Sequence, residues 1–250
     1  MATSDSQNVV LGIDIGGSGM KAGLVDVSMG TMASDRRRIA TPVSADPGQM
    51  SAVVAELVEH FDWNGPLGCT FPGVVRGQSV IETAANLNDE WIGVDASVVF
   101  ENACGSPVVM INDADAAGLA EMRAGAGVGA EGLVFMLTIG TGLGTALFNR
   151  GVLVPNTELG HIEIDGVDAE LRASSRARET EQLSFDVWAK RVERYLNRIE
   201  DLLWPDLFII GGGISKSFEG FAPMISTRAP MVPAALRNHA GIVGAALAAT

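Results

Sequence analysis

A carboxylate and a glycine-rich turn lie close together in one stretch of the chain, residues 109–146. Asp113 follows a short apolar run typical of a buried strand, and a carboxylate at that position can accept the proton of an attacking hydroxyl. A second apolar run ends in a turn that consists of Gly140, Thr141, Gly142, Leu143 and Gly144. Because glycine has no Cβ, the backbone N–H groups of such a turn can approach phosphate oxygens. The combination predicts phosphoryl transfer in a cleft between two domains.

A similar turn occurs near the start of the chain. Residues 9–15 are apolar, residues 20–27 resume a strand-like pattern, and the turn between them consists of Gly16, Gly17, Ser18 and Gly19. The pattern predicts a β-hairpin, since a Rossmann or P-loop element would need a helix directly after the glycines. Asp14 precedes the turn and Lys21 follows it, so the turn is a candidate phosphate site in which Asp14 orients Mg²⁺, directly or through water. Taken alone, an ordinary tight hairpin explains this turn better.

The two turns resemble each other, because each joins two apolar runs. Such a repeat predicts a duplicated architecture whose turns face each other across the cleft. A third glycine segment, Gly211-Gly212-Gly213, follows the apolar run 207–210. It is expected to open a helix, where backbone N–H groups can bind anions or a nucleotide ribose.

Other polar residues suit the hydroxyls of a sugar. Glu158, His161 and Glu170 offer two carboxylates and an imidazole, which together could bind several hydroxyls of one ligand. His161 taken alone would more often be a structural histidine. Asn86 offers both a donor and an acceptor, and an asparagine that binds its own loop backbone is an equally good explanation.

The segment Asn112-Asp113-Ala114-Asp115 joins a predicted strand over residues 107–111 to a predicted helix over residues 116–123. Asn and Asp before a helix usually cap it, and Asp115 is expected to be the cap. Asn112 and Asp113 would then be available at the carboxyl end of the strand, where α/β folds place their ligands.

Further helices are expected over residues 47–61, 95–104, 184–203 and 240–249. Asp46 is the expected N-cap of the first of these. The core face of the third is expected to consist of Trp188, Val192, Tyr195, Ile199 and Leu202.

The expected domain division is discontinuous. A C-terminal helix that returns to the first domain gives a small α/β domain of residues 1–112 and 238–250, and a larger α/β domain of residues 113–237. Pro230 and Pro233 are expected to lie in a loop.

Composition excludes several classes of protein. The 250 residues are 47% apolar and 19% charged, which is typical of a globular chain, and no apolar run is long enough to span a membrane. A net charge of −13 argues against a nucleic-acid binder. No secretory signal is visible, and Cys69 and Cys104 are expected to be buried, reduced thiols, so we expect a cytoplasmic protein.

Basic residues concentrate in one region. Seven of the 17 Lys and Arg residues lie there: Arg172, Arg176, Arg178, Lys190, Arg191, Arg194 and Arg198. Acidic residues are interleaved with them, so a solvated helix face with ion pairs is the default interpretation.

Five motifs of the chain resemble those of a known family, the ROK sugar kinases. The motifs that carry the resemblance are Ile13–Lys21, Asn112-Asp113-Ala114, Leu137–Gly144, Glu158-Leu159-Gly160-His161 and Ile210–Ile214, in the order of that family. The resemblance covers nearly the whole chain. It implies an actin-like ATPase (ribonuclease-H-like) fold, in which two α/β domains flank a cleft. ROK kinases usually carry a zinc-binding cysteine cluster after the Glu-Leu-Gly-His motif, and residues 162–169 contain no cysteine, so no zinc is expected.

The resemblance also implies roles for individual residues. Asp113 would take the proton of the glucose 6-hydroxyl. The other hydroxyls would be bound by Asn86, Asn112, Glu158, His161 and Glu170. The phosphoryl donor, with Mg²⁺ near Asp14, would be bound by Asp14, Gly16, Gly17, Ser18, Gly19, Lys21, Gly140, Thr141, Gly142, Gly144, Gly212 and Gly213.

Within the family, the short chain and the segments at residues 83–86 and 91–93 resemble the polyphosphate-dependent glucokinases of actinobacteria. Glucose is then the expected substrate, polyphosphate the expected donor with ATP as a further donor, and a homodimer the expected assembly. Some of the basic residues between Arg172 and Arg198, with Lys21 and Lys216, would line a track for the polyphosphate. The alternatives are an ATP-dependent glucokinase or mannokinase, and a non-catalytic sugar sensor on the same fold.

Overall fold

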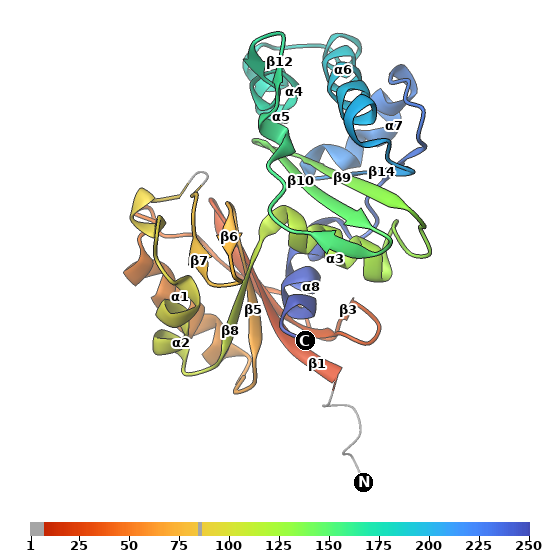
Figure 1. The fold of residues 1–250 in the computed structure, drawn as a ribbon. Coiled ribbons are helices and arrows are strands. Elements are labelled where there is room, and N and C mark those ends of the chain that lie inside the picture. Colours follow the sequence, from red (N-terminus) through yellow and green to blue (C-terminus); the bar gives the residue numbers. More distant parts are fainter. Residues whose placement is uncertain (1–7, 85–86) are drawn as a thin grey trace. The chain divides into compact units, whose positions relative to one another are not determined.

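The computed structural model describes residues 8–84 and 87–250. Contacts divide the chain into two compact units (Figure 1). Unit 1 comprises Met1–Ala124 with Asn238–Thr250, and unit 2 comprises Gly125–Arg237. Each unit has its own sheet and its own apolar core, so each is described separately.

Unit 1 is built on a six-stranded sheet in the order β3-β2-β1-β5-β8, with β4 also paired to β2. Its strands are β1 Val9–Gly16, β2 Gly19–Asp26, β3 Thr31–Met32, β4 Arg37–Ile39, β5 Leu67–Phe71 and β8 Val108–Asn112. β1 and β2 form the antiparallel hairpin that the sequence predicts, whereas β1, β5 and β8 run parallel. The carboxyl ends of these three parallel strands therefore meet at one edge of the sheet.

Helices cover both faces of this sheet (Figure 1). α1 (Pro47–His60) and α2 (Ala96–Cys104) pack together on one face, and α3 (Asp113–Ala124) packs with α8 (Ala240–Ala248) on the other. Asp46 caps α1 as expected, since its side chain accepts a hydrogen bond from the Gln49 N–H at 2.9 Å. A small hairpin of β6 (Val75–Arg76) and β7 (Val80–Ile81), with a 3₁₀ turn at Asp89–Trp91, completes the described part of unit 1.

The first unit is larger than the sequence-based division, which ended it at residue 112. α3 belongs to unit 1 because it packs against α8, and the boundary lies after Ala124. The chain returns to unit 1 at Asn238.

Unit 2 has a five-stranded sheet in the order β11-β10-β9-β14-β15. Its strands are β9 Leu133–Ile139, β10 Leu143–Asn149, β11 Val152–Val154, β14 Leu207–Gly211 and β15 Met231–Pro233, and a separate hairpin pairs β12 (Glu163–Ile164) with β13 (Val167–Asp168). The helices are α4 Glu170–Ala173, α5 Ser175–Thr180, α6 Phe185–Leu203 and α7 Phe218–Phe221. Short 3₁₀ helices span Leu159–His161, Gly213–Ser217 and Ala222–Met224, and a fourth, Arg237–His239, crosses the boundary into unit 1.

Three sequence-based expectations for secondary structure and packing are wrong in detail. Leu202 does not share the core face of α6, since its side chain is 50% exposed, while the other four expected core residues are buried. Pro233 ends β15 instead of lying in a loop, which an edge strand tolerates because its outer N–H groups have no ladder partner. Cys104 is only half-buried, whereas Cys69 is fully buried as expected, and both are free thiols.

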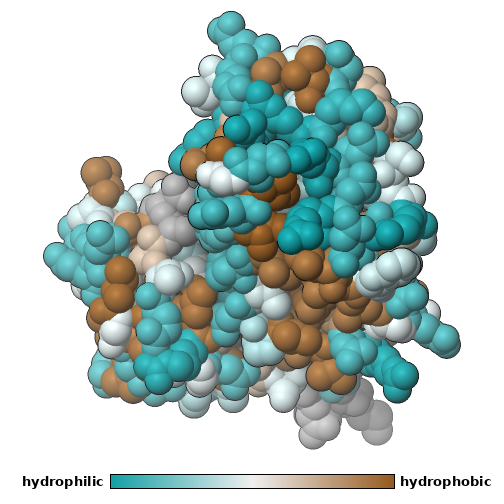
Figure 2. Space-filling view, turned by 45° about the horizontal axis from the view of Figure 1, so that its top comes forward, coloured by the Kyte–Doolittle hydropathy of each residue, from teal (hydrophilic) through white to brown (hydrophobic). Residues whose placement is uncertain are grey.

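Two features of the molecule concern the hydropathy of its surface and of its helices. At the end of unit 2 that carries β12 and α6, Figure 2 shows mainly hydrophilic residues with a small group of hydrophobic ones among them. Across the described residues, no helix combines the length and the apolar character needed to cross a membrane.

Candidate active site

Asp14 is held firmly at the carboxyl end of β1. Lys21 Nζ lies 2.8 Å from Asp14 Oδ2, and the Thr70 hydroxyl donates to Asp14 Oδ1 at 3.3 Å. The same hydroxyl oxygen accepts a hydrogen bond from the Ile15 N–H at 2.9 Å, which ties β5 to β1. The sequence places Asp14 and Lys21 on either side of the turn but gives no signal for Thr70, because Thr70 comes to lie beside Asp14 through strand pairing and not through spacing along the chain.

The first glycine turn is anchored through its carbonyl oxygens. Thr41 Oγ1 donates to the Gly16 carbonyl at 2.5 Å, and Arg38 Nη2 donates to the Ser18 carbonyl at 2.6 Å. A bare carbonyl oxygen repels phosphate, so side chains that occupy these two oxygens favour an anion at the turn. Sequence analysis identified neither Thr41 nor Arg38.

The end of β8 differs from the expectation. Asn112, not Asp115, caps α3, because its Oδ1 accepts hydrogen bonds from the N–H groups of Ala114 and Asp115, each at 2.9 Å. Asn112 Nδ2 donates to the Gly73 carbonyl at 3.0 Å. Asn112 is thus a buried residue that ties the start of α3 to the Gly73 segment. The prediction that its side chain is available for a ligand is wrong for the side-chain oxygen and for one amide hydrogen, which already have partners.

Asp113 lies at the same edge of the sheet as Asp14. It is the first residue of α3, it is exposed, and its Oδ1 accepts a hydrogen bond from the Ala114 N–H at 2.8 Å. Since β1, β5 and β8 are parallel neighbours, their ends bring Asp113, Asp14 and the first glycine turn to one edge of unit 1. Unit 1 therefore presents a carboxylate and an anion-binding turn together.

The second glycine turn, in unit 2, is held by a carboxylate. Glu170 Oε2 accepts a hydrogen bond from the Leu143 N–H at 2.9 Å, and the Ser175 N–H donates to the Gly140 carbonyl at 2.9 Å. Inside the turn, the Gly140 N–H donates to the Gly142 carbonyl at 3.0 Å. Glu170, which was expected to bind a sugar, therefore holds the second glycine turn in place.

The third glycine segment lies against the second turn. β14 pairs with β9, and Gly211 is the partner of Thr138. Gly212 has φ 78°, and a Cβ on it would lie 2.3 Å from the Ile139 carbonyl oxygen, so only glycine fits this position. The helix that follows is a 3₁₀ turn, Gly213–Ser217, and not the α-helix that was expected directly after the glycines.

Glu158, His161 and Glu170, the expected sugar ligands of unit 2, lie near one another beside the second turn. His161 Nε2 lies 3.8 Å from Glu158 Oε2, and His161 Nδ1 lies 2.9 Å from Asp168 Oδ2. Chiefly through the Asp168 hydrogen bond, with help from the neighbouring Glu170 carboxylate, the pKa of His161 is raised. Burial raises the pKa of Glu158, and His161 opposes that rise.

Sequence analysis missed Asp168. Its side chain fixes His161 on one side and accepts the Glu170 N–H at 2.8 Å on the other. The Asp165-Gly166 turn of the β12–β13 hairpin is a sequence signal for this arrangement, because Asp-Gly is a preferred two-residue hairpin turn.

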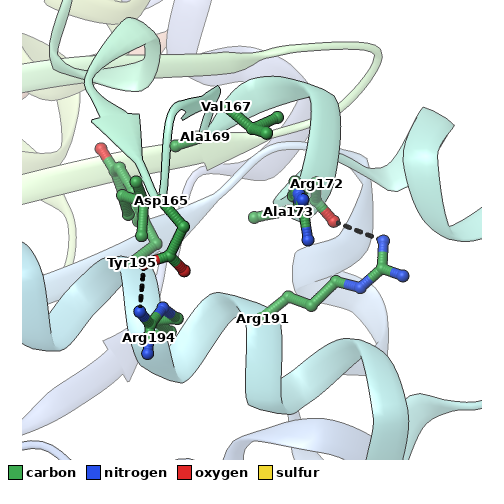
Figure 3. A pocket seen from close by; sticks show the side chains of 9 residues that line it. Asp165, Val167, Ala169, Arg172, Ala173, Arg191, Arg194 and Tyr195 are labelled. Carbon is green, nitrogen blue, oxygen red and sulfur yellow. Dashed lines mark hydrogen bonds and ion pairs between the residues drawn. The ribbon is translucent and has the colours of Figure 1, made fainter.

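The basic region on and around α6 is partly ion-paired, since Lys190, Arg191 and Arg194 each bind a carboxylate. Arg191 makes two bonds to the Glu181 carboxylate, at 2.8 and 2.7 Å, and Arg194 lies 2.5 Å from Asp165. Figure 3 shows Arg191 and Arg194 at a small cavity of about 70 Å³ under the β12–β13 hairpin, with Tyr195 and Arg172. The cavity is lined mainly by apolar groups, and burial raises the pKa of Tyr195.

Two further expectations concern Asn86 and metal ions. Asn86 lies outside the described residues. Within residues 8–84 and 87–250, no group of three or more His, Cys, Asp and Glu side chains is arranged to hold a metal ion. The absence of zinc stays a prediction.

Two α/β units, each with a glycine turn between antiparallel strands of its sheet, fit the actin-like fold of sugar kinases. A glucokinase from Streptomyces griseus, solved in complex with glucose and AMPPNP, has the same fold, with a TM-score of 0.80 and 26% identity over 95% of this chain and 98% of that chain.

Comparison of the sequence with known proteins identifies the family within this fold. Residues 10–176 match the ROK family, and the chain belongs to that family. It is 50% identical to the polyphosphate glucokinase of Mycobacterium tuberculosis over 238 aligned residues. These residues make up 95% of this chain and 89% of that protein. It is also 46% identical, with a TM-score of 0.92, to the inorganic polyphosphate/ATP-glucomannokinase of Arthrobacter sp. strain KM, over 96% of this chain and 98% of that chain.

Proposed function

We propose that this chain is a polyphosphate-dependent glucokinase that transfers a phosphoryl group to the 6-hydroxyl of glucose. The observation that carries the proposal is the 50% identity to a polyphosphate glucokinase over 95% of the chain. The described residues support it, since each unit keeps its glycine turn and the carboxylates beside it. A homodimer in the cytoplasm is part of the proposal.

In the proposed mechanism Asp113 is the general base. Its exposed carboxylate accepts the proton of the glucose 6-hydroxyl as that oxygen attacks the terminal phosphorus of the donor. An aspartate is a weak base, so its contribution is mainly alignment and late proton acceptance, because phosphoryl transfer depends mostly on positioning and charge neutralisation.

Glu158, His161 and Glu170 are the proposed ligands of the other glucose hydroxyls. Their grouping beside one turn gives two carboxylate acceptors and an imidazole whose Nδ1 is already bonded to Asp168. His161 Nε2 is then the atom that faces a ligand. Asn112 keeps one amide hydrogen beyond its bond to Gly73, and Asn86 completes the proposed set.

Both glycine turns, with Gly212 and Gly213, are proposed to bind the phosphoryl donor through backbone N–H groups. Donors of this kind act with a divalent metal, and we propose Mg²⁺, which would neutralise charge on the transferred phosphoryl group. Asp14 fits such an ion, since Mg²⁺ commonly takes one carboxylate, substrate phosphates and water. Because Lys21 and Thr70 already hold Asp14, we propose that it binds the ion through water.

A coupled assay for glucose 6-phosphate, with long-chain polyphosphate or ATP as the sole donor, tests the proposal. We expect turnover with polyphosphate and a higher kcat/KM than with ATP. Turnover with ATP alone would favour an ATP-dependent enzyme and refute the polyphosphate assignment.

One observation favours a broader specificity as a second candidate. The relative from Arthrobacter is described as a polyphosphate/ATP-glucomannokinase, and the Gly211–Gly213 segment that could accept a nucleotide is retained here. Equal kcat/KM values for glucose and mannose, and for both donors, would support this candidate over a strict polyphosphate glucokinase.

A further inference from the structure

Three consecutive arginines, Arg36, Arg37 and Arg38, lie just before and at the start of β4, and the function proposed above uses none of them as a donor ligand. All three are exposed. Among the described residues, none of them makes an ion pair with a carboxylate. In a chain of net charge −13, three neighbouring cations without carboxylate partners form a local positive field that an anion would meet first.

Three of the four basic residues of α6 are different. Lys190, Arg191 and Arg194 each lie within 3.0 Å of a carboxylate oxygen. A cation that is already paired has most of its charge compensated, so a polyanion gains less from it. The β4 arginines are therefore better candidates than these α6 residues for binding a polyanionic donor.

Strand pairing places Arg38 in a row with donor-site residues. Arg38 is the register partner of Lys21 across β4 and β2, and Lys21 is the partner of Asp14 across β2 and β1. Directly paired residues on neighbouring strands point to the same face. The row Asp14–Lys21–Arg38 thus carries one carboxylate and two cations, which leaves one positive charge next to the first glycine turn.

Arg38 is also fixed against that turn. Its Nη2 donates to the Ser18 carbonyl at 2.6 Å, and its guanidinium lies so close to Gly19 that a Cβ there would be 2.6 Å from Nε. A guanidinium has five N–H donors, so one bond to Ser18 leaves others that can reach phosphate oxygens.

We propose that Arg38 is a polyphosphate-binding residue, which holds the donor phosphates beside the first glycine turn. The inference rests on the proposed function and adds a subsite to it. Polyphosphate carries charge along its whole length, so the positive field of β4 extends the site beyond the phosphates that the turn itself binds.

Arg37 provides a matched control. It is the register partner of Ala22, and side chains alternate along a strand, so it faces away from the row. Arg37→Gln and Arg38→Gln remove the same charge from adjacent positions. Any difference between them reports the geometry of the row and not the net charge of the protein.

The experiment compares the wild-type enzyme with Arg37→Gln, Arg38→Gln and Arg38→Lys, using long-chain polyphosphate and glucose. For Arg38→Gln we expect the KM for polyphosphate to rise about tenfold, while the KM for glucose stays unchanged. As for other polyanions, the loss of one phosphate contact lowers the slope of log KM against log salt by about one. Arg38→Lys should be intermediate, and Arg37→Gln should behave as wild type.

Three outcomes decide the inference. Equal effects of Arg37→Gln and Arg38→Gln would overturn it, as would an unchanged salt slope in Arg38→Gln. A raised KM in Arg198→Gln, with none in Arg38→Gln, would also overturn it and place the track on α6. If the wild-type enzyme does not use polyphosphate at all, the proposed function fails before any variant is compared, so the two failures are distinguishable.

Discussion

Replacement of Glu170 by alanine tests how the second glycine turn is held. Glu170 Oε2 lies 2.9 Å from the Leu143 nitrogen, and Leu143 is only 3% exposed, so its N–H would lose its partner without gaining water. A hydrogen bond to a charged group contributes about 1.5–3 kcal/mol, and the half-buried state of Glu170 favours the lower end. We therefore expect Glu170→Ala to lower the free energy of unfolding by about 1.5 kcal/mol.

The assay is urea unfolding combined with hydrogen exchange at the Leu143 amide. Glu170→Gln keeps an acceptor oxygen and should recover part of the loss. Glu163→Ala is the matched control, because Glu163 is an exposed glutamate on β12 and should change stability by less than about 0.5 kcal/mol. Equal stability and equal Leu143 exchange in Glu170→Ala and Glu163→Ala would refute the assignment of Glu170 as the support of the turn.

Two further predictions concern unit 2. Asp168→Asn should lower the pKa of His161 in an NMR titration. Asp168 raises that pKa in the folded state, so the interaction between Asp168 and His161 stabilises the folded protein fully below pH about 6.5. This stabilisation is lost as the pH rises through the raised pKa. An unchanged titration of His161 in Asp168→Asn would contradict this prediction. Gly212→Ala should destabilise the protein by at least about 2 kcal/mol, through backbone strain and the clash with Ile139, in urea unfolding. Gly213→Ala is its control, since a Cβ there meets nothing within 4 Å, and equal stability of the two variants would contradict the reasoning.

Local patterns in the sequence predict most of the elements. The two glycine hairpins, the strand before Asp113 and the helices α1, α2, α6 and α8 follow from apolar periodicity, capping residues and glycine punctuation, which act over a few residues. The same local signals brought Glu158, His161 and Glu170 into one predicted site.

The cap of α3 shows where local signals become ambiguous. Asn112, Asp113 and Asp115 are all good capping residues, and the backbone at the end of β8 decides among them. Asn112 is the cap because its side-chain Oδ1 accepts hydrogen bonds from two N–H groups of α3, while its side-chain Nδ2 donates to the Gly73 carbonyl. Only the pairing of β8 with β5 brings the Gly73 segment there.

Arg38 and Thr70 show what no local pattern contains. Arg38 contacts the first glycine turn and Thr70 contacts Asp14 because a separate strand pairs with the β1–β2 hairpin, β4 on one side and β5 on the other. Such pairing joins residues far apart in the chain: Thr70 binds Asp14 over a separation of 56 residues. The helical periodicity and turn signals of the sequence carry no information about that register.

The most direct test of the central claim is the turnover of Asp113→Asn measured beside its affinity for glucose. Asparagine has the shape of aspartate but cannot accept the proton, so the account predicts a loss in kcat of at least about 10²-fold. Glucose affinity, measured by calorimetry, should stay within about twofold of wild type, because the loss is confined to the transition state. A variant that keeps near-normal kcat would contradict the account, since Asp113 would then not be the base.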